Sequence, residues 1–467
     1  MGYPRGMLLS LALTLLQSPV ALAESPMDFR LYPRDLATDA AAIAVAGDWA
    51  APDAGAVLRL EVSGSDGWSG VAEVEALPLV QAEAQPFRLA VAAPAGLVDY
   101  DVLLVLRHAG VDEVVASWER VAVGDVYLIH GQSNAVASDY YDEDLANARD
   151  QSPWIRSYGS ASRTPAEVLA DTTWHLADAE TDGGPGSVGI WALHLSRRIV
   201  EKQGVPIGLL NGAVGGTTVA QHQRNDADPD DLNTIYGRLL HRANAAGVAA
   251  DARALFWYQG ESDGAGAQGW LDGFGDLMAD WDVDFPGLEH LWIIQVRRGC
   301  GSPSLELRDH QRTLAHGDAT IHAATANGLP GHDGCHFRDK GYLQLALDLG
   351  PVVAHHLYGR PLVPDASSPD VLAASWDGAA QDAFFLDFRN VTAPLLVPDA
   401  SSYNTLTVDD GTQVVGVTAV GNRLRVELAG PSTAATVSFQ GHAYNRADWI
   451  VNARGLAMMG FFELPIQ

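Results

Sequence analysis

The stretch that most constrains the fold runs from Val126 to Ala135 and reads Val-Tyr-Leu-Ile-His-Gly-Gln-Ser-Asn-Ala. Its first four residues are apolar, which is typical of a strand buried on both faces of a parallel sheet. The small, polar residues that follow predict a tight turn that presents Ser133 beside backbone N–H groups. Open α/β folds place their chemistry at this carboxyl edge of the sheet. A plain turn with a helix-capping serine is the alternative interpretation of this stretch alone.

Strand-like and helix-like runs alternate through the middle of the chain. This alternation predicts a doubly wound α/β domain, in which a parallel sheet has helices on both faces. After the Val126 stretch we expect strands at 154–158, 205–211, 254–258, 291–296 and 320–325, and helices at 187–202, 231–246, 270–281, 304–316 and after Asp339.

The sequence pattern differs on both sides of this α/β region. Short apolar runs there are separated by Gly, Pro and Asp, as in β-rich domains. Prolines cluster near 362–370, which is typical of an interdomain linker. We predict a signal peptide at 1–23, an N-terminal β-sandwich at 24–123, an α/β domain at 124–362, a linker at 363–369 and a C-terminal β-rich domain at 370–467.

The N-terminus carries Arg5, an apolar run at 7–16 and then Val-Ala-Leu-Ala at 20–23. This order is typical of a secretory signal peptide, so we expect a secreted or periplasmic protein. No other stretch is apolar enough to predict a membrane span. The excess of 58 acidic over 29 basic residues gives a formal charge of −29, which makes nucleic acid and anionic membranes poor partners. The oligomeric state is left open.

Small and ionisable residues follow four of the expected strands, at 131–134, 211–218, 259–263 and 331–337. Four such turns at one sheet edge predict a shared crevice. A serine hydroxyl needs a base within reach, and the base needs an acceptor that orients it. Ser133, His336 and Asp333 match these three roles. Backbone N–H groups at Gly215 or Gly216, together with the Gln259 side chain, are the expected oxyanion donors.

Three of these motifs occur together and in order: Gly-Gln-Ser-Asn at 131–134, Trp-Tyr-Gln-Gly-Glu-Ser-Asp at 257–263 and Asp-Gly-Cys-His at 333–336. In this respect the chain resembles the sialate O-acetylesterase-like carbohydrate esterases of the SGNH/GDSL hydrolase superfamily. The resemblance spans about half the chain. It implies a flavodoxin-like sheet and deacetylation of an acetylated carbohydrate without a cofactor or metal.

By position, the resemblance makes Ser133 the nucleophile, His336 the base and Asp333 its orienting carboxylate. The Ser133 amide, a glycine of the 215–216 pair and Gln259 would form the oxyanion hole. The remaining motif residues are assigned to the oxyanion and substrate-binding group, namely Gln132, Asn134 and Glu261. The chain departs from the family in two places: Ala135 stands where Met is common, and the Gly-x-Asn-Asp block that usually supplies an oxyanion Asn is absent.

A second serine offers a competing nucleophile. Residues 260–264 fit Gly-x-Ser-x-Gly, the nucleophile elbow of α/β-hydrolases, and Ser262, Asp333 and His336 follow in the expected order. The next residues, Ala-Gly-Ala-Gln-Gly, are poor helix formers, although an elbow needs a helix immediately after the serine. Ser133 is therefore the preferred assignment.

Three further interpretations remain as alternatives. Glu261 paired with Asp263 or Asp333 would suit a glycosidase. A set of four histidines (His316, His322, His332 and His336) would suit a metal, but glycines beside the last two favour a loop, so we expect no metal. A non-catalytic carbohydrate-binding protein is the third alternative, in which the flanking β-domains and Trp174, Trp191 and Trp270 would supply the sugar-stacking surfaces.

The chain has two cysteines, Cys300 and Cys335. An isolated pair in an exported protein favours a disulfide over two free thiols, although the sequence alone leaves the bond open. Two cysteines are too few for a zinc–thiolate site.

Overall fold

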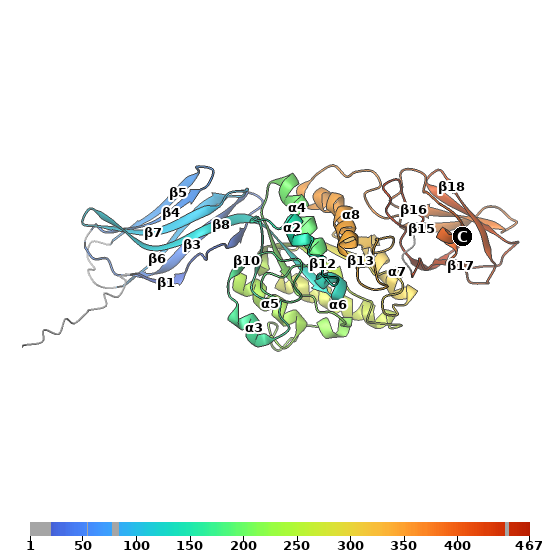
Figure 1. Ribbon diagram of the computed structural model, residues 1–467, viewed down its shortest axis with the longest axis horizontal. Helices are drawn as coiled ribbons and strands as arrows, with labels where there is room; N and C mark the ends of the chain where they lie inside the picture. The colour runs from blue at the N-terminus through green and yellow to red at the C-terminus, as the bar shows by residue number, and fades with distance from the viewer. Residues whose placement is uncertain (1–19, 54, 77–83, 444–447) are drawn as a thin grey trace, which may run out of the picture. The chain divides into compact units, whose positions relative to one another are not determined.

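The computed structural model describes residues 20–53, 55–76, 84–443 and 448–467 (Figure 1). The described chain forms two compact units, the first with 20–28, 42–93 and 98–121 and the second with 29–41, 94–97 and 122–467. The apolar run of the expected signal peptide at 7–16 lies outside the described residues. Val20–Glu24, at the expected cleavage site, forms strand β1 and pairs antiparallel with β3.

The first unit is built from antiparallel strands. One sheet has the order β1-β3-β6, and in the other part β4 pairs with β5 and β7. Every second residue of β6 is buried from Phe87 onward, as expected where one face of a strand covers a core. The bounds are β3 Ala40–Trp49, β4 Val57–Gly64, β5 Ser69–Glu75, β6 Gln85–Pro94 and β7 Tyr100–His108.

Strand β8, Val111–Gly131, is 21 residues long and crosses the predicted domain boundary at 123/124. Its first part pairs antiparallel with β7, and its last part pairs parallel with β11 and β12. Residues from Val121 onward are all buried, whereas those before are mostly exposed. The change in sequence pattern near Gly124 therefore corresponds to a change from exposed to buried residues within one strand.

The central sheet of the second unit has the order β10-β9-β11-β8-β12-β13-β14. Every neighbouring pair is parallel except β10 and β9. When β10 and β9 at one edge are left out, the remaining parallel strands β11-β8-β12-β13-β14 run in the order 2-1-3-4-5 of flavodoxin-like sheets, so the predicted fold class is confirmed. The bounds are β2 Leu31–Pro33, which pairs with β8, β9 Ile155–Tyr158, β10 Trp174–Leu176, β11 Ile207–Asn211, β12 Ala252–Tyr258, β13 His290–Gln295 and β14 Ile321–Thr325.

Helices cover both faces of this sheet, with α4 and α8 on one side and α5 and α6 on the other (Figure 1). Neighbouring residues of β12 face opposite layers: the Phe256 ring lies 5.7 Å from Trp191 of α4, and the Trp257 ring lies 5.5 Å from Trp281 of α6. The bounds are α1 Ser133–Val136, α2 Ala146–Asp150, α3 Pro165–Ala170, α4 Ile190–Gln203, α5 Ile235–Ala246, α6 Ala267–Asp284, α7 Leu305–Thr313 and α8 Asp339–Tyr358, with 3₁₀ turns at Val219–His222, Ala249–Asp251, Leu314–His316 and Ala400–Tyr403. Among the described residues no helix has the length and apolar character needed to cross a membrane.

The C-terminal region forms a four-stranded sheet, β15-β16-β19-β18, and a three-stranded sheet, β17-β20-β21, around a shared apolar core. The segment expected to be a linker is held in place, because Asn452 Nδ2 donates to the carbonyls of Asp365 and Ser367. The bounds are β15 Val371–Trp376, β16 Ala383–Phe388, β17 Leu406–Val408, β18 Val414–Val420, β19 Arg423–Leu428, β20 Thr436–Phe439 and β21 Phe461–Pro465.

Candidate active site

The turn after β8 sets the position of Ser133. Gly131 has φ +136°, and a Cβ there would lie 2.2 Å from the Tyr258 carbonyl oxygen, so only glycine lets β8 pass this close to β12. Gln132 precedes α1 in an extended conformation, and Ser133 is the first residue of that helix. Ser133 therefore lies at the junction of strand and helix, at the carboxyl edge of the sheet.

The glycines after β11 lie next to this serine. A Cβ added at Gly215 would be 3.4 Å from the Ser133 Cβ, whereas one at Gly216 would meet no neighbour within 4 Å. Val214 N donates to the Gly131 carbonyl over 3.0 Å and fixes the two turns together. Within the described part of the chain, the N–H groups of Ser133 and Gly215 donate to no other protein group. These two N–H groups are thus free to bind an oxyanion beside Ser133.

Asp333 and His336 share one turn before α8. Asp333 Oδ1 accepts the backbone N–H groups of Cys335 at 2.7 Å and His336 at 2.9 Å. Burial lowers the pKa of His336 below 6.5, although the Asp333 charge opposes this. Burial raises the pKa of Asp333, but hydrogen bonds from Cys335, Tyr141 and His336 outweigh it and hold that pKa below 3.8. Near neutral pH the pair therefore consists of a neutral imidazole and a carboxylate.

Tyr140 connects the serine turn with the histidine turn. Its hydroxyl donates to the Ser133 carbonyl over 2.8 Å, and its ring packs on the His336 ring with centroids 4.2 Å apart. Tyr141 donates to the His336 carbonyl over 3.4 Å. Neither tyrosine could be singled out from the sequence, because two adjacent aromatic residues in a loop carry no pattern that separates this role from ordinary packing.

The buried side chains of Asn134 and Glu261 connect three of the predicted turns to one another. Asn134 Nδ2 donates to Glu261 Oε1 over 2.9 Å and to the Cys335 carbonyl over 3.4 Å, and Tyr342 donates to Asn134 Oδ1 over 3.0 Å. Burial raises the pKa of Glu261 to about 7. Both side chains are buried, so they position the turns and do not line an open surface.

The structure corrects the prediction that Gln259 supplies an oxyanion donor. Its Nε2 donates to the Thr217 carbonyl over 3.0 Å, to Gln132 Oε1 over 3.3 Å and to Asp263. Its Oε1 accepts Trp270 Nε1 over 2.8 Å, and the whole side chain is buried. Gln259 is therefore committed to tying turns together, as is Gln132, whose Oε1 also accepts the Gly260 and Ser262 N–H groups.

The geometry around Ser262 differs from a nucleophile elbow. Helix α6 begins only at Ala267, with a turn between, so the strand–serine–helix junction is missing there. The three tryptophans named as sugar-stacking residues are buried, with exposed fractions of 5% for Trp174 and 0% for Trp191 and Trp270, so they offer no stacking surface.

Cys300 and Cys335 form a disulfide, which joins the loop after β13 to the turn of His336. Arg297 in the same loop donates to the Gly334 carbonyl and, over 2.5 Å, to the Ala443 carbonyl. A Cβ at Gly301 would lie 1.9 Å from the Glu261 carbonyl oxygen, so this loop also packs tightly on the Glu261 turn. The disulfide and the Arg297 hydrogen bond therefore both attach the histidine turn to the loop after β13, which itself packs on the Glu261 turn.

Arg163 is a further residue that the sequence analysis missed. Its Nη2 lies 3.6 Å from the position of a Gly215 Cβ, which places a guanidinium beside the serine turn. It forms an ion pair of 3.4 Å with Asp182, and its side chain is 53% exposed. A lone arginine in a loop gives no motif by which to find it.

Comparison with known families matches residues 123–355 to the family described as carbohydrate esterase, sialic acid-specific acetylesterase. No curated protein sequence matches the chain. A carbohydrate acetylesterase from Xanthomonas citri has the same fold, with a TM-score of 0.64 and 18% identity over 95% of this chain and 99% of its own.

Two other solved structures are less similar. A protein from Arabidopsis thaliana covers 49% of this chain and 97% of its own at 21% identity and a TM-score of 0.38. A family two carbohydrate esterase from Cellvibrio japonicus covers 73% of this chain and 96% of its own at 11% identity and a TM-score of 0.32. Through residues 123–355, which hold the turns of Ser133, Glu261 and His336, this chain belongs to the sialic acid-specific acetylesterase family of carbohydrate esterases.

Proposed function

We propose that this chain is an exported serine esterase that removes O-acetyl groups from sialic acid or another acetylated carbohydrate through an acetyl-enzyme. The family supports the reaction class. The observation that carries the mechanism is the convergence at one sheet edge of Ser133, the unpaired Gly215 N–H and the His336 ring packed on Tyr140. The description of the Xanthomonas citri neighbour as a carbohydrate acetylesterase agrees with this proposal.

In the first half-reaction, Ser133 Oγ attacks the acetyl carbonyl carbon while His336 takes the hydroxyl proton. The carbonyl oxygen becomes an oxyanion and is bound by the Ser133 and Gly215 N–H groups. Collapse of the intermediate breaks the bond to the sugar oxygen, which leaves with the proton from His336. Asp333 stabilises the imidazolium formed between these steps.

In the second half-reaction, water attacks the acetyl carbon and gives one proton to His336. The bond to Ser133 Oγ then breaks as His336 returns the proton to the serine, and acetic acid leaves and loses its remaining proton to the solvent. Each atom required comes from the ester, water or the named residues.

Export is part of the same proposal. The charged start, the apolar run at 7–16 and the Val-Ala-Leu-Ala sequence at 20–23 support it. Fractionation of cells that express the full chain, with N-terminal sequencing of the product, tests it: a product that retains residues 1–23 in the cytosol would contradict export.

The decisive experiment compares hydrolysis of p-nitrophenyl acetate and of acetylated glycans by the wild type, Ser133→Ala and Ser262→Ala, with a chelator present. We expect Ser133→Ala to reduce kcat by about 10³-fold or more, while Ser262→Ala retains most of the activity. Loss confined to Ser262→Ala would transfer the nucleophile role to the elbow. A wild type without esterase activity would favour glycan binding.

The choice of sugar is open to a sharper test at Arg163. Sialic acids carry a carboxylate, and a guanidinium beside the serine turn is suited to bind one. We expect Arg163→Met to raise KM about tenfold for O-acetylated sialic acid and to change KM little for acetylated xylose, which is neutral. Equal effects on both substrates would assign Arg163 no part in recognising the carboxylate.

A further inference from the structure

The side chains of three histidines from separate elements lie close together near the amino ends of the strands, opposite the carboxyl ends that carry Ser133. His290 begins β13, His322 is the second residue of β14, and His356 lies in the last turn of α8. The ring centroids are 4.9 Å apart for His290 and His322, 5.1 Å for His290 and His356, and 3.9 Å for His322 and His356. One nitrogen from each ring lies within 4.8 Å of the others.

The sequence offered a different set of histidines as metal ligands, namely His316, His322, His332 and His336, and the structure separates that set. His316 pairs with Asp370 at 2.7 Å, and His336 lies at the candidate active site. His322 instead contacts His290, with 3.0 Å between Nε2 and Nδ1. The members of the new trio are 32 and 34 residues apart in the sequence, so no short spacing motif marks them.

We propose that His290, His322 and His356 form a binding site for a divalent transition-metal ion, with Zn²⁺ as the best fit. Three imidazole nitrogens suit Zn²⁺, Ni²⁺ or Cu²⁺, whereas Mg²⁺ and Ca²⁺ prefer oxygen ligands. Zn–N bonds of the usual length in a tetrahedral site imply nitrogens about 3.3 Å apart. The observed spacing therefore needs only small ring rotations.

The state of the three rings agrees with ligation. Burial lowers the pKa of His322 to about 3 and that of His356 to about 4, and it also lowers the pKa of His290. At neutral pH each ring is therefore uncharged and keeps one nitrogen lone pair. Trp292 packs on His322 with centroids 4.9 Å apart and shields one side of the cluster.

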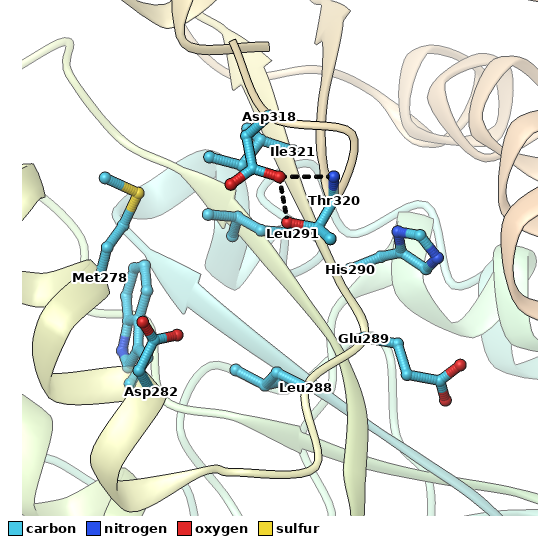
Figure 2. A pocket seen from close by; sticks show the side chains of 10 residues that line it. Met278, Asp282, Leu288, Glu289, His290, Leu291, Asp318, Thr320 and Ile321 are labelled. Atoms are coloured by element: carbon cyan, nitrogen blue, oxygen red, sulfur yellow. Dashed lines mark hydrogen bonds between the residues drawn. The ribbon is translucent and has the colours of Figure 1, made fainter.

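The nearby carboxylates already have partners. Glu289 accepts Arg253 Nε over 2.5 Å, and Asp318 Oδ1 accepts both the backbone N–H and the hydroxyl of Thr320. Figure 2 shows the Asp318 carboxylate turned to Thr320 and the His290 ring directed away from Met278 and Asp282. The site thus has three protein ligands, and a fourth position is left for water or another small ligand.

The expected effect of the ion is structural. Arg253 Nη2 donates to the Leu357 carbonyl over 2.8 Å, and Tyr358 donates to Asp125 over 2.7 Å, so the end of α8 is already docked on the sheet. A metal at the trio would add a bond between α8, β13 and β14 at this point. Because the ion binds the folded chain, it should raise the thermal stability without taking part in ester hydrolysis.

The test uses the full chain, purified without a histidine tag and freed of metal by a chelator. Titration with Zn²⁺ in a calorimeter should give one ion per chain with micromolar or tighter affinity, and Zn²⁺ should raise Tm. Co²⁺ should give the visible absorption of a nitrogen-ligated tetrahedral site. His356→Ala and His322→Gln should each weaken Zn²⁺ binding at least 100-fold.

His355→Ala is the matched control, because His355 precedes His356 in the same helix but is not one of the three ligands: its ring lies 4.8 Å from that of His356, and its Nδ1 contacts the Arg360 carbonyl at 2.7 Å. It should bind Zn²⁺ like the wild type, and Ser133→Ala should do so as well. The proposal fails if the wild type shows no saturable binding. It also fails if both trio variants bind normally or if His355→Ala loses as much affinity as they do.

Discussion

At the scale of single residues, two opposing effects determine the pKa of His336. Burial lowers its pKa, and the Asp333 carboxylate raises it by stabilising the imidazolium. Removing the charge in Asp333→Asn leaves burial alone, so the pKa of His336 should fall further. We expect kcat to fall as well, because the imidazolium of the transition state loses its counter-charge.

The measurement is the pH profile of kcat/KM for p-nitrophenyl acetate. The wild type should lose activity only below pH 6.5, because the base must be unprotonated, and the acid limb of Asp333→Asn should lie at lower pH. An acid limb that moves to higher pH would contradict the assignment of Asp333 as the partner of His336.

Glu261 gives a second prediction at this scale. Burial raises its folded-state pKa from 4.5 to about 7. The native state therefore favours the protonated form, and this contribution to stability is present below pH 4.5 and is lost as the pH rises through about 7. The full effect is about 3 kcal/mol, since one pKa unit corresponds to about 1.4 kcal/mol.

Glu261→Gln keeps an acceptor for Asn134 and removes the charge. Its free energy of unfolding should exceed that of the wild type by an amount that grows between pH 5 and pH 8. Glu201→Gln, at an exposed position of α4, is the control and should show no such trend. A constant difference across this pH range would contradict a buried, titrating Glu261.

At the scale of elements, the disulfide ties the turn of His336 to the loop after β13. The bonded cysteines are 35 residues apart, for which the loop-entropy model gives about 4 kcal/mol of stabilisation. In the double variant Cys300→Ser/Cys335→Ser we expect activity to fall before the fold is lost, because the released turn carries His336, the proposed base.

Circular dichroism and acetylesterase assays at rising urea concentration, with and without reductant, make this check. The reduced wild type should behave like the double variant, and the double variant should not respond to reductant. Activity that falls only together with the circular dichroism signal would contradict the prediction that activity is lost before the fold.

The elements also show what the sequence can and cannot predict. Ser133, Asp333 and His336 could be proposed from the sequence because each lies in a turn after a strand, where parallel sheets gather their chemistry; their catalytic roles stay a prediction. Gln259 was misassigned because an amide at a strand end looks the same whether it faces a substrate or holds a neighbouring turn. The short elements β10, α2 and α3 were missed because three to six residues are too few to show a period.

At the scale of the whole second unit, the C-terminal sheets complete the hydrogen bonds of the central domain. Gln295 at the end of β13 donates to the carbonyls of Arg308 and Gly460, each over 2.8 Å, and accepts the Gly460 N–H over 2.9 Å. Arg308 is buried and donates to the Gln440 carbonyl over 2.7 Å. The composition of 370–467 predicted its strands, but not these long-range partners.

Gln295→Met should therefore destabilise the protein by about 3 kcal/mol, since it leaves several buried groups without partners. Gln268→Met, at an exposed position of α6, should change the free energy of unfolding by less than about 0.5 kcal/mol. Urea denaturation of both variants measures these changes in the free energy of unfolding. A Gln295→Met variant as stable as the control would mean that the interface contributes little.

This interface also limits how such a protein can change during evolution. A β-rich tail that only bound sugar would be free to be lost, duplicated or exchanged between genes. Here the tail supplies backbone groups that Gln295 and Arg308 need inside the esterase domain. Recombination that brings in a foreign tail must therefore also bring complementary backbone at Gln440 and Gly460, so the two regions are constrained to be inherited together.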